Sequence, residues 1–251
     1  MALGSALSIA LVDSATAAAG RSEREHQRLL GAVKTITVEE ANVSSKSGKW
    51  IEGKRRLERT TTFNREGNLI KEVIHANGSG VSTITYRYDG NGNRTDSIYN
   101  EGVFSRPPAR EDEWNDIRQV RLIRWRFKYD ADNNRTEELA YSSVAHGPIS
   151  GEVLIQRYVH NYDDKGNRET TLYYDTTVLL NKWAYVYDNK GTLTEQSRYS
   201  AGGRLELKEV CSCEFDSSGN WIKKTISREK IKKGGPHFDP EKVIYRTITY
   251  Y

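Results

Sequence analysis

A short motif recurs six times along this chain and constrains its fold more than any other feature. It reads FNREGNL from Phe63, YDGNGNR from Tyr88, YDADNNR from Tyr129, YDDKGNR from Tyr162, YDNKGTL from Tyr187 and FDSSGNW from Phe215. Each copy has an aromatic residue, then Asp or Asn, two variable residues, and Gly or Asn. Successive copies start between 25 residues (Phe63 to Tyr88) and 41 residues (Tyr88 to Tyr129) apart. Such spacing is typical of a chain built from repeated supersecondary units.

The residues of the motif are those of a tight turn. An Asp at the first turn position accepts a hydrogen bond from the backbone ahead of it. Gly or Asn three residues later tolerates the left-handed conformation of a type I turn followed by a bulge. On either side of the turns, polar and apolar residues alternate with the period of a strand. The sequence therefore predicts an all-β fold: an antiparallel meander of about 13–14 strands built from repeated hairpins, forming an extended coiled or partly closed sheet.

The ends of this meander have sequence signals of their own. The last residues, VIYRTITYY, repeat the first strand of a unit without its turn, which predicts a closing strand. KTITVEEAN and KWIEGKRRLERTTTF are expected to form strands ahead of the first hairpin. At the edge opposite the tight turns, NEGVFSRPPAREDEWNDIR, SSVAHGPISGE and SREKIKKGGPHFDPEK are expected to be irregular loops. Functional residues on a rigid β scaffold often lie in such loops.

The first residues predict export. An apolar run, Ala6 to Val12, precedes an Ala-Thr-Ala triplet that ends at Ala17, the pattern that a signal peptidase accepts, although no basic residues precede the run. We therefore expect residues 1–19 to be a signal peptide, residues 20–34 a polar N-terminal segment and residues 35–251 a single β domain. No later stretch has the roughly 18 apolar residues of a membrane-spanning helix. The 38 basic and 34 acidic residues give a net charge of only +4, which does not favour nucleic acid as a partner.

The core Tyr-Asp-x-x-Gly-Asn-Arg, clearest at residues 88–94 and 162–168, resembles the YD-repeat (Rhs-repeat) family. This family occurs in secreted bacterial toxins, wall-associated proteins and animal teneurins. The resemblance implies an antiparallel sheet that coils into a shell, within which large members enclose a cargo polypeptide. With six units and no recognisable core-associated or toxin segment, the chain resembles a short member. The family supplies no catalytic residues to carry over.

The sequence contains only partial patterns for a metal site or for a functional cysteine pair. Asp89, Asn91 and Asn93 place oxygens as in the opening of a calcium loop, but Arg94 stands where that loop needs Gly, so a plain hairpin turn is expected. Cys211 and Cys213 share one face of a strand and fall short of a four-ligand zinc site. We expect them to pack as small apolar residues, with a strained disulfide as the alternative. No metal and no cofactor are predicted.

One strand carries the best candidate for ligand binding. LIRWRFKY places Arg124, Arg126 and Lys128 on one face and Trp125 on the other. These four residues form the predicted ligand site, since aromatic rings stack on sugars and cations hold anions. The alternative is a solvated face balanced by cross-strand carboxylates such as Glu137. The five histidines and the acidic pair Glu137–Glu138 are expected to be solvated surface.

These features predict a secreted, periplasmic or cell-envelope protein of a bacterium. We expect a non-enzymatic binding or structural module, whose partner is a polysaccharide or an envelope protein. One alternative is an outer-membrane β-barrel, favoured by strand number and alternation and opposed by a mean hydropathy of −0.74. The other is a glycoside hydrolase that works from loop carboxylates: Glu111, Asp112, Glu113 and Asp116.

Overall fold

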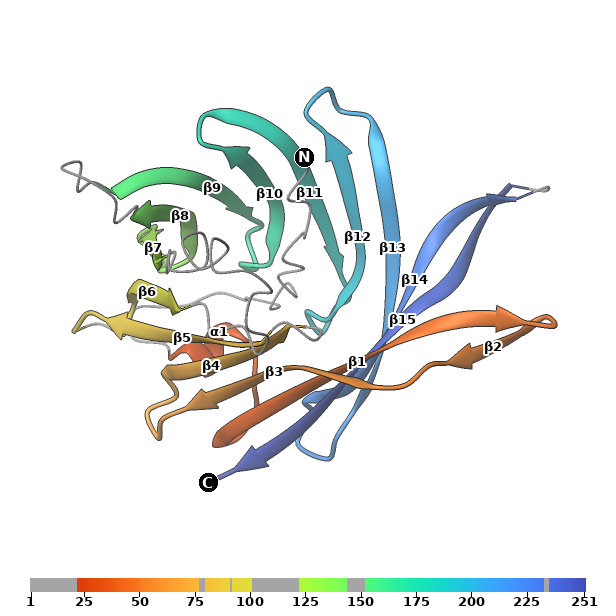
Figure 1. Ribbon diagram of the computed structural model, residues 1–251, viewed down its shortest axis with the longest axis horizontal. Coiled ribbons are helices and arrows are strands. Elements are labelled where there is room, and N and C mark those ends of the chain that lie inside the picture. Colours follow the sequence, from red (N-terminus) through yellow and green to blue (C-terminus); the bar gives the residue numbers. More distant parts are fainter. Residues whose placement is uncertain (1–21, 77–79, 91, 101–121, 144–151, 233–234) are drawn as a thin grey trace, which may run out of the picture.

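The computed structural model describes residues 22–76, 80–90, 92–100, 122–143, 152–232 and 235–251. This part of the chain contains one short helix and fifteen strands (Figure 1). In chain order they are α1 (Glu23–His26), β1 (Val33–Lys46), β2 (Lys49–Glu52), β3 (Arg56–Phe63), β4 (Leu69–Ala76), β5 (Gly80–Tyr88), β6 (Arg94–Asn100), β7 (Leu122–Tyr129), β8 (Arg135–Ser143), β9 (Glu152–Tyr162), β10 (Arg168–Asp175), β11 (Val178–Tyr187), β12 (Leu193–Ser200), β13 (Leu205–Phe215), β14 (Trp221–Lys232) and β15 (Gly235–Tyr250).

The strands form a closed antiparallel barrel. From β3 to β15 each strand pairs with its sequence neighbour, and β1 pairs with both β3 and β15. The seam between β1 and β15 runs from Val33 opposite Tyr250 to Asn42 opposite Lys242. Strand β2 pairs with the far end of β1 and stands outside the ring, which leaves fourteen strands in the wall (Figure 1). The all-β antiparallel prediction and the closing strand are confirmed, and the sheet closes completely.

The six recurring motifs form six turns, here called corners, that share one geometry and one end of the barrel. They span residues 64–68, 89–93, 130–134, 163–167, 188–192 and 216–220. The first side chain accepts a hydrogen bond from the backbone nitrogen four residues on, at 2.7 to 2.9 Å. The fourth residue has positive φ in every corner, including Asn133 at 63°. Left-handed backbone at this position explains why Gly, or Asn as its substitute, recurs there.

A seventh turn of the same geometry lies at the opposite end. Ser200 replaces Asp, its Oγ accepts from the nitrogen of Arg204 at 3.2 Å, and Gly203 has φ of 82°. The sequence pattern missed this turn because a hydroxyl takes the place of the carboxylate.

The corner tyrosines join successive hairpins. The hydroxyl of Tyr129 donates to the carbonyl of Arg94 at 3.0 Å, and that of Tyr162 donates to the carbonyl of Arg135 at 2.8 Å. In each case the acceptor is the first residue of the second strand in the preceding hairpin. Tyr88 makes the equivalent bond to Leu69 at 2.8 Å. In these three repeats the tyrosine of the motif therefore anchors its hairpin to the one before it.

Two sequence predictions about the ends of hairpins are wrong. The expected loop SREKIKKGGPHFDPEK is a paired extension of β14 and β15, with Ser227 opposite Pro240 and Lys232 opposite Gly235. Pro240 sits at a register shift, where a strand tolerates a residue without an N–H group. The segment KWIEGKRRLERTTTF contains two strands, because β2 folds back on β1 before β3 begins.

The inner and outer faces of the wall differ in what they carry. A small apolar core lies where β1, β3 and β4 meet the N-terminal segment, and consists of Leu29, Val33, Ile36, Val38, Phe63 and Leu69. Elsewhere the inner face is aromatic and charged. A barrel of eight strands is just filled by side chains, so a wall of fourteen strands encloses a wider lumen.

Candidate functional site

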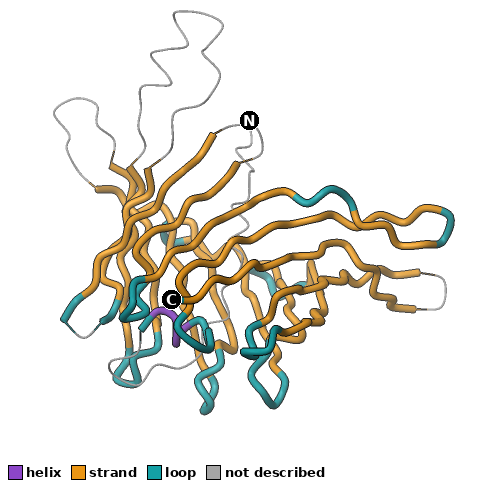
Figure 2. The backbone as a smooth tube through the Cα atoms, turned by 90° about the horizontal axis from the view of Figure 1, so that it is seen from below, coloured by secondary structure: helices purple, strands orange, loops and turns teal. Residues whose placement is uncertain are grey.

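Residues 22–30, here called the cap, cross the corner end of the barrel. Figures 1 and 2 show α1 at this end, among the corner turns. Ser22 begins the helix, and its backbone nitrogen donates to the carboxylate of Glu25 at 2.6 Å, half of a capping box. The short helix presents Glu23, and the turn after it presents Arg28, to the corners of the wall.

The cap contacts all six corners or the residue that follows each. Arg24 donates from its backbone to Gly67 at 2.9 Å and from its side chain to the carbonyl of Arg65 at 3.0 Å. The carboxylate of Glu23 pairs with Arg94 and Arg135, which follow the second and third corners. Arg28 donates to the side chain of Asn167 and, at 2.5 Å, to the carbonyl of Gly191.

The last corner holds the end of the cap. Asn220 accepts from the nitrogen of Leu30 at 2.8 Å and donates to its carbonyl at 2.9 Å. The chain's own N-terminal segment therefore crosses the corner end of the barrel and is held there by the corners.

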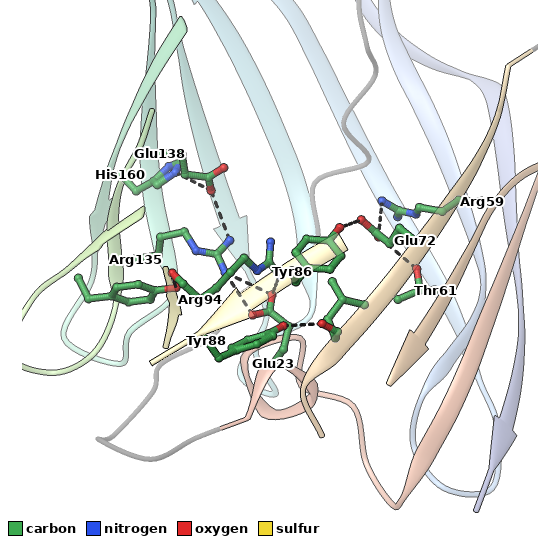
Figure 3. Close-up of polar contacts among 12 residues, drawn as sticks. Glu23, Arg59, Thr61, Glu72, Tyr86, Tyr88, Arg94, Arg135, Glu138 and His160 are labelled. Carbon is green, nitrogen blue, oxygen red and sulfur yellow. Dashed lines mark hydrogen bonds and ion pairs between the residues drawn. The ribbon is translucent and has the colours of Figure 1, made fainter. Parts of the chain in front are cut away.

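A continuous ion-pair network runs from the cap into the wall (Figure 3). The carboxylate of Glu23, which is 5% exposed, pairs with Arg94 on β6 and with Arg135 on β8. Arg135 also lies 3.5 Å from Glu138, and Glu138 lies 3.1 Å from the ring of His160 on β9. The network thus joins α1 to β6 and β8 through buried ion pairs, and to β9 through the hydrogen bond between His160 and Glu138.

Burial and charge set the protonation states of this network. The hydrogen bond from His160 and the charge of Arg135 hold the pKa of Glu138 far below its ordinary value, despite burial. Burial, helped by the charges of Arg168 and Arg135, lowers the pKa of His160 to about 4. His160 is therefore neutral at pH 7. Since a carboxylate only accepts, its Nε2 carries the proton, and its Nδ1 accepts from the hydroxyl of Thr171 at 2.9 Å.

A second buried cluster adjoins the first. Glu72 on β4 lies 3.4 Å from Arg59 and accepts from Thr61 at 3.2 Å and from the hydroxyl of Tyr86. The guanidinium of Arg94 lies 4.5 Å from the centre of the Tyr86 ring, which connects the two clusters (Figure 3). Burial and the adjacent Glu72 carboxylate raise the pKa of Tyr86, so its hydroxyl remains a donor.

The inner wall beyond the network carries a row of aromatic rings, here called the ladder. Trp125 on β7 lies 5.9 Å from Tyr158 on β9, and Tyr158 stacks on Tyr173 of β10 at 4.8 Å. All three side chains are half-buried, so part of each ring reaches solvent. Polar groups flank the ladder: Gln156 donates to the hydroxyl of Tyr173 at 3.1 Å, and Asn181 lies opposite Tyr173.

The four residues of the predicted ligand site lie on opposite faces of β7. Trp125 points inward and belongs to the ladder, whereas Arg124, Arg126 and Lys128 point outward. Their charges are balanced by carboxylates on neighbouring strands. Arg124 lies 2.6 Å from Asp96 and 3.1 Å from Glu152, Arg126 lies 2.5 Å from Glu152, and Lys128 pairs with Glu137.

The structure also bears on the possible calcium loop at Asp89 and on the possible disulfide between Cys211 and Cys213. Asp89 accepts from the nitrogen of Asn93 at 2.9 Å, as expected of a plain turn. Cys211 and Cys213 are not joined in a disulfide. In the described residues no three His, Cys, Asp or Glu side chains gather as metal ligands.

Of the remaining candidates, some are buried and others lie outside the described residues. The expectation of solvated surface is wrong for His160, which is 4% exposed inside the wall, and for Glu137, which is 7% exposed. His146 and the loop acids Glu111, Asp112, Glu113 and Asp116 lie outside the described residues, as do the predicted signal peptide and most of the predicted long loops.

Fold and site together define a closed fourteen-stranded antiparallel barrel with a charged, aromatic lumen and an internal N-terminal cap. It is similar in fold to the crystal structure of a porin-like protein from Bacteroides uniformis, with a TM-score of 0.51 and 9% sequence identity over 86% of this chain and 98% of that one. A TcdB2-TccC3 crystal structure matches with a TM-score of 0.30 and 10% identity, over 81% of this chain and 11% of that one. No family model and no curated protein matches.

In the described residues, no helix has the length and apolar character needed to cross a bilayer.

Proposed function

We propose that this chain is a non-enzymatic, water-exposed barrel of the bacterial cell envelope that binds a carbohydrate on the aromatic wall of its lumen. The observation that carries the proposal is the ladder of Trp125, Tyr158 and Tyr173, whose rings are half-buried on the inner face of a wide barrel. Rings with accessible faces and polar neighbours suit sugars, which stack through their C–H faces and hydrogen-bond through their hydroxyls.

The charged side chains on the outer face of the wall favour a barrel whose outside is exposed to water. Outward-facing strand residues form cross-strand ion pairs, including Lys208 with Glu195 at 3.0 Å and Lys223 with Glu214 at 2.7 Å. Lys128 is 64% exposed on the same face. A lysine or arginine facing lipid at the middle of a bilayer costs about 2–4 kcal/mol. Several such residues, spread over β7 to β14, oppose a lipid-facing band.

The two acids of the ion-pair network, Glu23 and Glu138, favour a role without catalysis. A glycoside hydrolase needs one carboxylic acid that is protonated at working pH. The pKa of Glu138 is lowered, which keeps this side chain ionised, and Glu23 is engaged in ion pairs with two buried arginines. Their surroundings favour structural pairing over proton transfer.

A glycan array with purified full chain tests the site. The informative variant is Trp125→Ala, and its matched control is Trp50→Ala, which removes the same side chain from the exposed β2 hairpin. We expect the wild type and Trp50→Ala to share a binding profile that Trp125→Ala loses while retaining a cooperative melting transition. Identical profiles for all three proteins would exclude the ladder as the site.

An outer-membrane barrel is the second candidate. Closure of the wall, its fourteen strands and the polar lumen all favour this function, as does the fold that the chain shares with a porin-like protein. Cell fractionation discriminates between the two candidates. Recovery in buffer without detergent supports the water-exposed barrel. Recovery only with detergent from the outer-membrane fraction replaces it with the second candidate.

A further inference from the structure

Two hairpins extend beyond the wall of the barrel at the end opposite the corners, and they are here called the arms. The first arm is the far end of β1 with β2 (residues 43–55), and the second is the far end of β14 with the start of β15 (residues 227–232 and 235–241). The seam between β1 and β15 stops where Asn42 lies opposite Lys242, and beyond this pair each strand continues with a different partner. Figures 1 and 2 both show the arms as separate projections on one side of the molecule.

The first arm is uncovered by the described part of the chain. Every residue from 44 to 55 is exposed. Trp50 is 46% and Ile51 is 45% exposed, and as neighbours on β2 they point to opposite faces of the hairpin. A two-stranded hairpin alone in water is only marginally stable. The first arm therefore presents apolar side chains on both faces, without a layer of the described chain to cover them.

The first arm also concentrates positive charge. Residues 44–55 have a local net charge of +3, against +4 for the whole chain, because they contain Lys46, Lys49, Lys54 and Arg55 but only one acid, Glu52. Lys46 lies directly opposite Lys49, and neither lysine has an ion-pair partner in the described residues. Like charges directly opposite each other destabilise a strand pair. An anionic group that contacts both ammonium groups would remove this repulsion.

The second arm has the same two properties. Ile231 is 79% exposed, more than any other large apolar side chain in the described residues. Lys230 and Lys232 are about half exposed and share a single carboxylate, that of Asp239, at 3.5 and 2.7 Å. This arm therefore also combines an exposed aliphatic side chain with lysines whose charge is only partly balanced.

The strand register places the lysines of both arms on one face of the sheet. On β1 this face includes Ile36 inside the barrel, Asn42 and, at the tip, Lys46. Asn42 lies opposite Lys242, which lies opposite Ile226 on β14, and the same face of β14 continues to Lys230 and Lys232. An extended anionic surface matches such an arrangement better than a small anion does.

The side chains of the arms favour a lipid surface over other partners. A second copy of the chain would bring the same positive charge, and Pro236 and Pro240 lack the N–H groups that an added strand would need on β15. An acidic polymer would pair with the lysines but would leave Trp50 and Ile231 in water. A layer of lipid headgroups offers phosphates to lysines and an apolar boundary to Trp and Ile, and it surrounds both faces of an inserted tip.

We infer that the two arms dock the barrel on a membrane surface that carries anionic lipid headgroups. Lys46, Lys49, Lys230 and Lys232 contact the phosphates, and Trp50, Ile51 and Ile231 enter the boundary beneath them. The inference goes beyond the proposed function and does not depend on it, since the ladder lies inside the wall and the arms lie outside it.

Vesicle flotation with the full chain tests the charged part of the docking surface. At low salt we expect the wild type to bind vesicles of phosphatidylcholine with phosphatidylglycerol at least about tenfold more strongly than vesicles of phosphatidylcholine alone. One lysine near an anionic surface contributes about fivefold, so the double variant Lys46→Gln, Lys49→Gln should bind roughly twentyfold more weakly. The matched control Lys165→Gln, Lys190→Gln removes two exposed lysines from the corners and should bind as the wild type does.

A second pair of variants tests the apolar part. Ile231→Ser should weaken binding by about fivefold, because an aliphatic side chain no longer leaves water. Its control is Val178→Ser, which changes a residue that is 62% exposed at the start of β11, and which should bind as the wild type does. High salt should release the wild type from the vesicles, since it screens the lysines.

The outcomes separate this inference from the proposed function. Equal binding to both kinds of vesicle, undiminished binding by the lysine double variant, or release only with detergent overturns the docking surface. Binding to polygalacturonate without binding to vesicles also overturns it, because the arms then take an acidic polymer. A glycan profile that Trp125→Ala loses, together with no vesicle binding by the wild type, keeps the proposed function and rejects the docking surface.

Discussion

A substitution of the buried Glu23 provides the sharpest test of where the cap lies. Glu23→Gln preserves the shape of the side chain but removes the charge that neutralises Arg94 and Arg135. Removing one partner of a buried ion pair costs about 3–5 kcal/mol, because the other charge is left uncompensated. For a chain of this size, each kcal/mol lowers the melting temperature by about 2–4 °C. We therefore expect Glu23→Gln to melt roughly 6–20 °C below the wild type in a thermal scan followed by circular dichroism.

The neighbouring Glu25 supplies the control. It lies on the exposed side of α1, and its carboxylate accepts only from Ser22 in the described contacts. Gln can make the same capping contact, so Glu25→Gln should change stability by less than about 0.5 kcal/mol. Limited trypsin digestion adds a local readout, since a released cap exposes Arg24 and Arg28. Equal melting and equal cleavage of the two variants would refute the placement of the cap among the corners.

Two further predictions concern the corner end and the luminal histidine. Ala at Gly203, where φ is 82° and no atom lies within 4 Å of the added Cβ, should cost about 1 kcal/mol. Ala at Gly191, where φ is 78°, should cost at least about 1.5 kcal/mol more in urea unfolding, because its Cβ would displace the guanidinium of Arg28 and break the hydrogen bonds that it donates to Asn167 and Gly191. Equal costs would contradict the contact between Arg28 and the fifth corner. Because the pKa of His160 is lowered to about 4, the unfolded chain binds a proton that the folded chain does not between pH 6.5 and pH 4. The free energy of unfolding should therefore fall on acidification through that window, by about 2 kcal/mol from pH 7 to pH 5. His160→Gln should remove most of this loss. Parallel pH profiles of the two proteins would count against a neutral His160.

The local parts of this fold could be predicted from the sequence because their causes are local. An Asp, a left-handed Gly or Asn and flanking alternation determine a corner within about ten residues. The pattern fails where another residue supplies the same hydrogen bond, as Ser200 does. It also fails where Pro240 is read as the end of a strand, although a register shift in β15 accommodates it.

The site was much harder to predict, because its residues come from distant parts of the chain. Glu23 and Arg135 are 112 residues apart, and Arg28 and Gly191 are 163 apart. Nothing local reveals that a polar segment before the first strand will cross the corner end. Two signals do exist in the sequence: the capping box of Ser22 and Glu25, and the arginine that follows three of the six motifs. The first predicts a helix, and the second predicts equivalent positions that share one environment.

The sixth corner contributes to closure of the barrel. The local sequence of a hairpin meander does not determine whether the sheet closes. Bringing β15 to β1 across about 200 residues costs roughly 5 kcal/mol of loop-closure entropy. Asn220 offsets part of this cost, because its side chain bonds the end of the cap at Leu30 and donates to the hydroxyl of Tyr250 at 2.9 Å. The cap leads directly into β1, and Tyr250 ends β15. One corner asparagine therefore holds both strands of the seam at the same place, so the sixth copy of the motif does more than turn the chain.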